Sequence, residues 1–260
     1  MNVVEYEGFM ESPNQKPILF LLKDWRVEKM SIYITGDVHG DFSAMQRWCE
    51  IVEPDKNDII VILGDAGLNY FGGERDRERK MLANSLGSTI FCIHGNHEMR
   101  PEKAGGYETV EWHGASAWAE PEFAHLMFAK DGEIYDLGGE KAVVLGGAYS
   151  TDKHFRLAYG YRWFEDEQPS DAVKRLAEET LAGAGWKVPV VLSHTCPYKY
   201  RPIEAMRSGI SQSKVDTSTE EWLDRIEERL DYRKWYCGHW HINKRVDKVE
   251  FLFHDIRILD

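Results

Sequence analysis

The sequence has few cysteines and no apolar run long enough to cross a membrane. Its 4 cysteines lie far apart and form no C-x-x-C pair, which predicts reduced thiols. They are Cys49, Cys92, Cys196 and Cys237. Apolar runs such as residues 59–63 stop at Gly and Asp, well short of the ~20 residues that a membrane-spanning helix requires. Since no signal-peptide pattern is seen either, we expect a cytoplasmic protein that does not enter a membrane.

Positive charge is also scarce. The chain has 32 Lys and Arg against 44 Asp and Glu, and its formal net charge is −12. Tight binding to a nucleic-acid duplex draws most of its affinity from Lys and Arg side chains that neutralise phosphates, so a duplex is disfavoured as a partner. A small phosphorylated molecule can still bind an acidic protein if cations or bound metal ions are concentrated in one cleft.

The length and the apolar pattern predict one α/β domain. The chain has 260 residues, 43% of them hydrophobic, which is enough for a large core. Short apolar runs end in Gly-Asp, Gly-Asn or Ser-His and are mostly followed by helix-like periodicity, which predicts alternating strands and helices. Strands are predicted at 32–35 and 59–63, and helices at 74–86, 171–181 and 220–230. Thr217 and Glu220 have capping-box spacing at the start of the last helix.

Two stretches depart from this alternation. Residues 99–140 combine glycines and aromatics with weak periodicity, and we predict an insertion near the functional site there. Residues 1–30 are turn-rich, and we hypothesise that Met30 is the natural start of a chain whose upstream segment is a mis-called extension. Trp25 is encoded by TGG, so an AGR codon for Arg26 would place the ribosome-binding sequence GGAG just upstream of the Met30 codon. The alternative is an N-terminal arm that packs on a single domain formed by residues 31–260.

The ends of the predicted strands carry side chains that bind metal ions. Seven such residues follow five strands: Asp37, His39, Asp65, Asn96, His194, His239 and His241. In open α/β sheets the loops at the carboxyl ends of the strands converge on one crevice, so these side chains are expected to meet. The i, i+2 spacing of the first pair and of the last pair directs both side chains to one side of an extended segment. Imidazole, carboxylate and amide ligands suit borderline divalent ions.

These residues stand in five short motifs that occur in a fixed order. A single Gly-Asp is usually a turn, but "GDVHG", "GDAG", "GNHE", "SHT" and "GHWH" in this order resemble the calcineurin-like metallophosphoesterase superfamily. The stretch "GGAYSTDKHFRLAYGYRWFEDEQPS" resembles a bacterial and phage-type subgroup of it. The resemblance extends from residue 32 to the end of the chain. It implies a four-layer α/β/β/α sandwich in which two mixed sheets are flanked by helices, a feature that periodicity alone does not predict.

The resemblance also implies two divalent metal ions and assigns their ligands. One ion would be held by Asp37, His39 and His241, the other by Asn96, His194 and His239, and Asp65 would bridge them. Mn, Fe, Zn and similar ions all remain open, because such ligands do not discriminate strongly between them.

The implied function is hydrolysis of phosphomonoesters or phosphodiesters. Two ions share a bridging hydroxide, which attacks phosphorus in line. Asp65 would be catalytic through its bridging position. His97 stands where the family keeps its candidate general acid for the leaving alkoxide, and Asn96 would also contact the substrate.

The chain differs from the serine/threonine protein phosphatases, which share some of these motifs. Leu68 and Asn69 stand where those enzymes carry Asp and Arg, and His94 stands where they carry another Arg. The carboxylate that orients the histidine and both cationic clamps are therefore missing from their usual places. Lys153 and Arg156 are the predicted substitutes for phosphate binding, and the alternative is that both lie on a solvated surface.

The motifs leave the substrate open. Five aromatic side chains could form a wall for a nucleobase or could belong to the core: Tyr149, Tyr159, Tyr161, Trp163 and Trp240. We expect a small phosphorylated substrate, with a nucleotide as one option. The alternatives are a phosphoprotein phosphatase, a nuclease that acts on short single strands, and a metal-binding scaffold without turnover. A scaffold would predict gaps among the ligands, and the sequence has none. The oligomeric state is not predicted.

Overall fold

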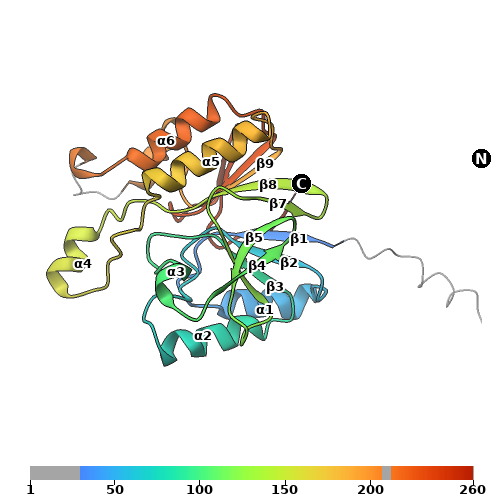
Figure 1. The fold of residues 1–260 in the computed structure, drawn as a ribbon. Helices are drawn as coiled ribbons and strands as arrows, with labels where there is room; N and C mark the ends of the chain where they lie inside the picture. Colours follow the sequence, from blue (N-terminus) through green and yellow to red (C-terminus); the bar gives the residue numbers. More distant parts are fainter. Residues whose placement is uncertain (1–29, 207–211, 260) are drawn as a thin grey trace, which may run out of the picture.

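Two mixed β-sheets lie face to face at the centre of the fold, with helices on their outer faces (Figure 1). The structure is a computed structural model that describes residues 30–206 and 212–259. The predicted four-layer α/β/β/α arrangement is confirmed. The hypothesis that Met30 is the natural start concerns residues 1–29, which lie outside the described residues.

The first sheet is built on four parallel strands, and in the described part of the chain its order is β13-β1-β2-β3-β6-β5-β4. The parallel strands are β1 (Ile32–Thr35), β2 (Ile59–Ile62), β3 (Thr89–Cys92) and β6 (Leu126–Ala129). The antiparallel strands are β4 (Glu108–Trp112), β5 (Ala115–Ala119) and β13 (Arg257–Ile258). Every residue of β2 is buried, as expected for a central parallel strand that is covered on both faces.

The second sheet has the order β11-β12-β10-β9-β8-β7 over the same described residues. Its parallel strands are β8 (Glu140–Leu145), β9 (Val190–Ser193), β10 (Lys234–Cys237) and β12 (Val249–Phe251). Its antiparallel strands are β7 (Ile134–Leu137) and β11 (Lys244–Val246).

Helices cover the outer face of each sheet. In Figure 1, α1 (Ser43–Val52) and α2 (Glu74–Asn84) lie along the first sheet, and α5 (Asp171–Gly183) and α6 (Ser218–Glu227) lie along the second. The short helices are α3 (Pro101–Ala104) and α4 (Lys153–Tyr159), and α4 projects from the body of the molecule. Three 3-10 turns follow β9, at Tyr198–Tyr200, Ile203–Ala205 and Gln212–Lys214. No helix of the described residues is long and apolar enough to cross a bilayer.

Three apolar clusters hold the layers together. Residues such as Val61 and Val144 form the cluster between the two sheets. Met45 on α1 and Ile60 on β2 belong to the cluster under the first pair of helices. Trp222 on α6 belongs to the cluster under the second pair. Because both faces of each sheet are covered, the strands bury side chains on both sides, and their polar residues are concentrated where the strands end.

The start of α6 differs from the sequence prediction. The helix begins at Ser218, and the Thr217 side chain makes no capping bond to a backbone N–H. Instead its hydroxyl donates to Glu221 Oε1, at 2.7 Å. Asp216 Oδ1 accepts from the backbone N–H of Ser218, at 2.9 Å. The predicted capping box is therefore wrong, because Asp216 satisfies the helix start while Glu220 is buried and accepts a hydrogen bond from Thr195.

Residues 99–140, where the sequence predicted an insertion near the site, form α3 and the strands β4 to β7. β4 and β7 are edge strands of the two sheets, and β5 and β6 lie inside the first. The weak periodicity of this stretch has a simple cause. Its strands are about as long as β1 to β3, but β4, β5 and β7 mix charged, polar or small residues with the apolar ones and form no continuous apolar run.

Candidate metal centre and active site

The loops that follow five parallel strands bring all the predicted metal ligands to one end of the sheets. Asp37 and His39 follow β1, Asp65 follows β2, Asn96 follows β3, His194 follows β9, and His239 and His241 follow β10. Each of these side chains lies within 4 Å of another of the set. The convergence that the sequence predicted is thus seen in the structure.

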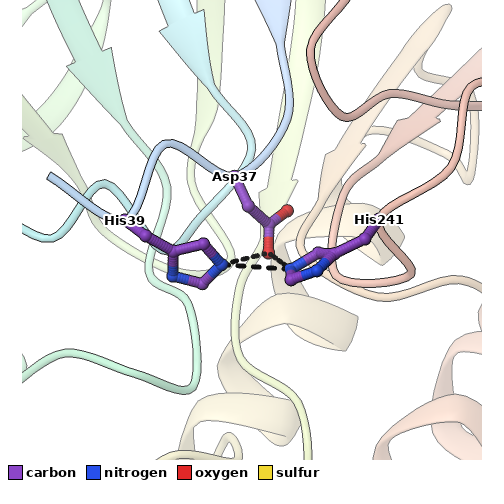
Figure 2. Close-up of side chains that lie close together, drawn as sticks. All are labelled: Asp37, His39 and His241. Atoms are coloured by element: carbon purple, nitrogen blue, oxygen red, sulfur yellow. Dashed lines mark hydrogen bonds and ion pairs between the residues drawn. The ribbon is translucent and has the colours of Figure 1, made fainter. Parts of the chain in front are cut away.

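Asp37, His39 and His241 form one group (Figure 2). Asp37 Oδ2 lies 3.2 Å from His241 Nε2 and 3.7 Å from His39 Nε2. The two Nε2 atoms are 3.0 Å apart. Two imidazole nitrogens and a carboxylate oxygen that converge in this way could hold one divalent ion.

Asn96, His194 and His239 form a second group. Asn96 Oδ1 lies 2.8 Å from His194 Nε2 and 3.0 Å from His239 Nδ1. The amide of Asn96 is oriented by its Nδ2, which donates to Ser150 Oγ at 2.8 Å. His194 is oriented as well, because its Nδ1 lies 2.7 Å from the carbonyl oxygen of Leu63 and must donate to it.

The orientation of His194 makes the second group fit a cation. With its proton on Nδ1, a neutral His194 has a lone pair on Nε2. In this neutral form the lone pair would face the amide oxygen of Asn96, with no hydrogen between the two acceptors. A metal ion would satisfy both atoms, and the backbone carbonyl that fixes the imidazole is the kind of partner that metal-binding histidines have.

Asp65 lies between the two groups. Its Oδ1 accepts from the backbone N–H of His97 at 2.8 Å, which leaves Oδ2 directed to the histidines. Oδ2 lies 3.9 Å from His39 Nδ1 and 3.8 Å from His194 Nε2. Asp37 is held in the same way, since its Oδ1 accepts from the backbone N–H of His239 at 2.7 Å. Both carboxylates therefore direct their Oδ2 atom to the histidines.

The backbone at the ligands is strained. Four ligands have a positive φ that side-chain-bearing residues rarely adopt: His39 (52°), Asp65 (51°), His239 (65°) and His241 (51°). Such outliers concentrate at functional sites. Gly95 is required for a related reason, because a Cβ there would lie 2.1 Å from Asp65 Oδ1. The glycine that precedes Asn96 thus lets the carboxylate lie against the backbone.

The charge states of the buried ligands suit a metal ion. Burial alone would raise the pKa of Asp65, but the positive charges that the neighbouring imidazoles carry when protonated, first among them that of His194, outweigh it and hold this pKa well below the usual range. Burial would raise the pKa of Asp37 too, but the hydrogen bond from His241 and the charges of His194 and His39 together outweigh it and lower this pKa. Burial lowers the pKa of His239 to about 3. Ionised carboxylates and neutral imidazoles are the forms that bind metal ions.

His97 lies beside the ligands and contacts Arg156. Arg156 Nη2 lies 3.2 Å from His97 Nε2, and since a guanidinium only donates, Nε2 accepts and the His97 proton is on Nδ1. Arg156 is itself held by Asp152 Oδ1, at 2.9 Å from Nε, and by the hydroxyl of Tyr70, at 3.2 Å from Nη1. Burial, opposed by Asp65 and assisted by Arg156, lowers the pKa of His97.

The other predicted cation, Lys153, does not join the site. Its ammonium lies 3.9 Å from the centre of the Trp163 ring. The positions at which the protein phosphatases carry their orienting carboxylate and clamps are closed. Leu68 and His94 are buried, and Asn69 Oδ1 accepts a hydrogen bond from Tyr107 at 2.8 Å.

Two cavities meet at His97. The larger, of about 310 Å³, is bordered by ligands such as His239 and by Tyr149, Arg201, Glu220 and Trp240. The smaller, of about 170 Å³, lies between His39 and His97 and is lined by Tyr70, Phe71, Arg79 and Arg156. The predicted aromatic wall is thus formed only in part. Tyr149 and Trp240 line the larger cavity, whereas Tyr159 and Tyr161 are exposed.

Sequence reasoning missed the residues that support the site. Ser150 and Asp152 lie between two motifs, where no spacing rule applies. Arg79 lies in a helix whose charged half is typical of a solvated surface. Glu220 was read as a helix cap. The only sequence signal for this group is the cluster of polar residues at 150–156, just after β8.

A family model described as calcineurin-like phosphoesterase matches residues 30–243. The chain belongs to the calcineurin-like phosphoesterase family. The resemblance seen in the motifs is confirmed, and so is the enzyme class of metal-dependent phosphoric ester hydrolase. The family uses divalent metal ions, and the grouped ligands described above are candidates for holding them.

The other comparisons find a partial sequence match and two solved structures of low sequence identity. A segment of 72 residues is 36% identical to a symmetrical bis(5'-nucleosyl)-tetraphosphatase of Wigglesworthia glossinidia brevipalpis. This segment is 27% of the chain and spans only 25% of that enzyme. The crystal structure of TT1561 of Thermus thermophilus is 12% identical, with a TM-score of 0.49 over 89% of this chain and 98% of that one. Another solved structure is 14% identical, with a TM-score of 0.47 over 88% and 98% of the two chains.

Proposed function

We propose that the protein is a dinuclear phosphoesterase that hydrolyses small phosphomonoesters or phosphodiesters, with nucleotides as its substrate class. The proposal rests above all on the convergence of three ligand atoms in the second group, where Asn96 Oδ1 lies 2.8 Å from His194 Nε2 and 3.0 Å from His239 Nδ1. It assigns one ion to Asp37, His39 and His241 and the other to Asn96, His194 and His239, with Asp65 between them. The identity of the metals, among Mn, Fe and Zn, is left to measurement.

Bound divalent ions would supply an activated water as the nucleophile and neutralise the phosphate oxygens. The residues of the chain do the rest. Asp65 places its Oδ2 between the two ligand groups and so links the two halves of the site. As an imidazolium, His97 gives one proton to the leaving oxygen and is left as the neutral imidazole. Arg156 leaves His97 Nε2 to bind the substrate phosphate together with Asn96, which frees Nε2 to take up this proton. Lys153 is left out of the proposal, since its ammonium lies over Trp163.

The substrate class is supported by two observations. The larger cavity borders the ligands and offers the aromatic faces of Tyr149 and Trp240, on which a nucleobase can stack. The partial relative is a bis(5'-nucleosyl)-tetraphosphatase. A phosphoprotein phosphatase is less well supported, because the positions of its two arginine clamps are occupied by buried Asn69 and His94. A scaffold without turnover is less well supported too, because the ligand set is complete.

The test is hydrolysis of p-nitrophenyl phosphate and bis-p-nitrophenyl phosphate by metal-stripped protein, with and without added Mn²⁺. We expect turnover only with the metal, and the better substrate decides between monoester and diester chemistry. His125→Ala is the control variant and should keep the metal-dependent turnover of wild type, because this partly exposed histidine lies outside the site and its ring makes no hydrogen bond, ion pair or ring contact within the described residues. Turnover that is equal with and without metal would contradict the proposal.

A further inference from the structure

Arg79 on α2 lies against the loops that carry two of the metal ligands. Its Nη1 donates to the carbonyl oxygen of Gly67 at 3.0 Å. Its guanidinium also packs on Gly40, where an added Cβ would lie 2.4 Å from Arg79 Cζ. Gly40 directly follows His39, and Gly67 follows Asp65 by two residues. The guanidinium is therefore fixed beside the metal centre rather than free in solvent.

Among the residues that the structure describes, no carboxylate neutralises the charge of Arg79. Its neighbours on the same helix are paired, Arg77 with Glu122 and Lys80 with Glu120. Within residues 30–206 and 212–259, no carboxylate lies within 4 Å of the Arg79 guanidinium. The bond to Gly67 uses one of its five N–H donors, and the Phe71 ring lies 4.9 Å away.

The free side of Arg79 borders the smaller cavity. This cavity has a volume of about 170 Å³ and is lined on its other walls by Arg156, His39 and His97. Two guanidiniums thus face a small space next to a metal ligand, in a protein whose net charge is −12. A guanidinium is the side chain best suited to bidentate binding of phosphate. The smaller cavity has the size and the charge for one phosphate group.

We propose that the smaller cavity binds a second phosphate group of the substrate, adjacent to the one that is hydrolysed, with Arg79 as its principal contact. This inference rests on the proposed function for the position of the first phosphate. It names the substrate more closely: molecules with a chain of phosphates, such as nucleoside polyphosphates, are preferred over simple phosphomonoesters. Arg79 and Arg156 replace the two phosphate-binding arginines that protein phosphatases carry next to the "GDAG" and "GNHE" motifs.

The alternative is that Arg79 only holds the Gly40 and Gly67 loops in place. A structural role would make its loss harmful to folding and to the binding of every phosphorylated ligand alike. A phosphate subsite makes its loss selective for ligands with more than one phosphate. Arg75 provides the matched control, because its guanidinium lies 3.5 Å from the centre of the same Phe71 ring but does not line the cavity.

The experiment is isothermal titration of Mn²⁺-loaded protein with inorganic triphosphate and with orthophosphate, at a fixed concentration of free Mn²⁺. Wild type, Arg79→Ala, Arg79→Lys and Arg75→Ala are compared, and thermal unfolding curves show whether each variant is folded. We expect triphosphate to bind wild type about tenfold or more tightly than orthophosphate. Arg79→Ala should lose most of that preference, Arg79→Lys should keep part of it, and Arg75→Ala should keep all of it.

The outcomes separate this inference from the proposed function. Equal affinities of wild type for the two anions would overturn the subsite, and so would equal losses in Arg79→Ala and Arg75→Ala. An Arg79→Ala variant that weakens both anions by the same factor would support the structural role instead. Selective loss of triphosphate binding in a protein that hydrolyses neither nitrophenyl ester would support the subsite and contradict the proposed function.

Discussion

Asn96 Oδ1 lies 2.8 Å from His194 Nε2, although both atoms are acceptors when His194 is neutral. The carbonyl of Leu63 and the hydroxyl of Ser150 fix the two side chains in this arrangement. A pair of facing acceptors is costly to bury unless a cation lies between them. This relationship is the strongest structural support for a metal ion at the second group of ligands.

Ser150→Ala tests how the Asn96 amide is held. The substitution removes the acceptor of Asn96 Nδ2, so the amide can turn its NH₂ toward the histidines. We expect metal affinity to fall by about 10- to 100-fold at one of two sites, as is usual when a supporting hydrogen bond to a ligand is lost. Ser88→Ala is the control, because Ser88 is equally buried and bonds only to the carbonyl of Asp55. Unchanged Mn²⁺ affinity at both sites would remove Ser150 from the account.

His97→Ala tests the general acid. We expect metal content to stay unchanged, because the His97 imidazole is not one of the proposed ligands. Turnover should fall by about 10²- to 10⁴-fold for phenyl phosphate, whose leaving group needs a proton. Nitrophenolate hardly needs one, so turnover of p-nitrophenyl phosphate should fall much less. Measured rates that fall by the same factor for both esters would exclude the acid role.

Glu220 makes the stability of the fold depend on pH. Burial raises its pKa to about 7, from 4.5 in a solvated glutamate. The folded state then holds a proton that the unfolded state has lost, so stability falls as pH rises from 4.5 to 7. This shift corresponds to at most about 3 kcal/mol in the free energy of unfolding.

Glu220→Gln should remove this dependence, since the amide can still accept the bond from Thr195 and carries no charge. Denaturation by urea would show the variant close to wild type at about pH 5 and more stable than wild type at about pH 8. Glu221→Gln removes the same charge from an exposed neighbour and is the control. If both variants gain the same amount over this pH range, the burial of Glu220 is not the cause.

Much of the fold and the set of ligands could be predicted because both depend on local signals. An apolar run followed by Gly-Asp or Gly-Asn marks a strand end, and Asp65 and Asn96 were found in this way. The second sheet was predicted only through the family resemblance, because periodicity does not tell which strands pair. Most of the strands between 99 and 140 were missed because they mix charged, polar or small residues with the apolar ones, and no Gly-Asp or Gly-Asn follows them.

The supporting residues could not be predicted, for a different reason. Arg79 reaches the site by packing across Gly40, and Glu220 by the burial of one face of α6. Both contacts join segments far apart in the sequence. A charged residue in a helix is normally solvated, and only the three-dimensional arrangement distinguishes the unpaired Arg79 from Arg77 and Lys80 beside it.

The central claim is that two metal ions share Asp65. Calorimetric titration of metal-stripped protein with Mn²⁺ tests this claim most directly, in wild type and in Asp65→Asn. We predict two ions per chain in wild type and a loss of affinity at both sites together in the variant, because the carboxylate lies between the two groups. A single bound ion in wild type, or a variant that weakens only one of two sites, would contradict the account.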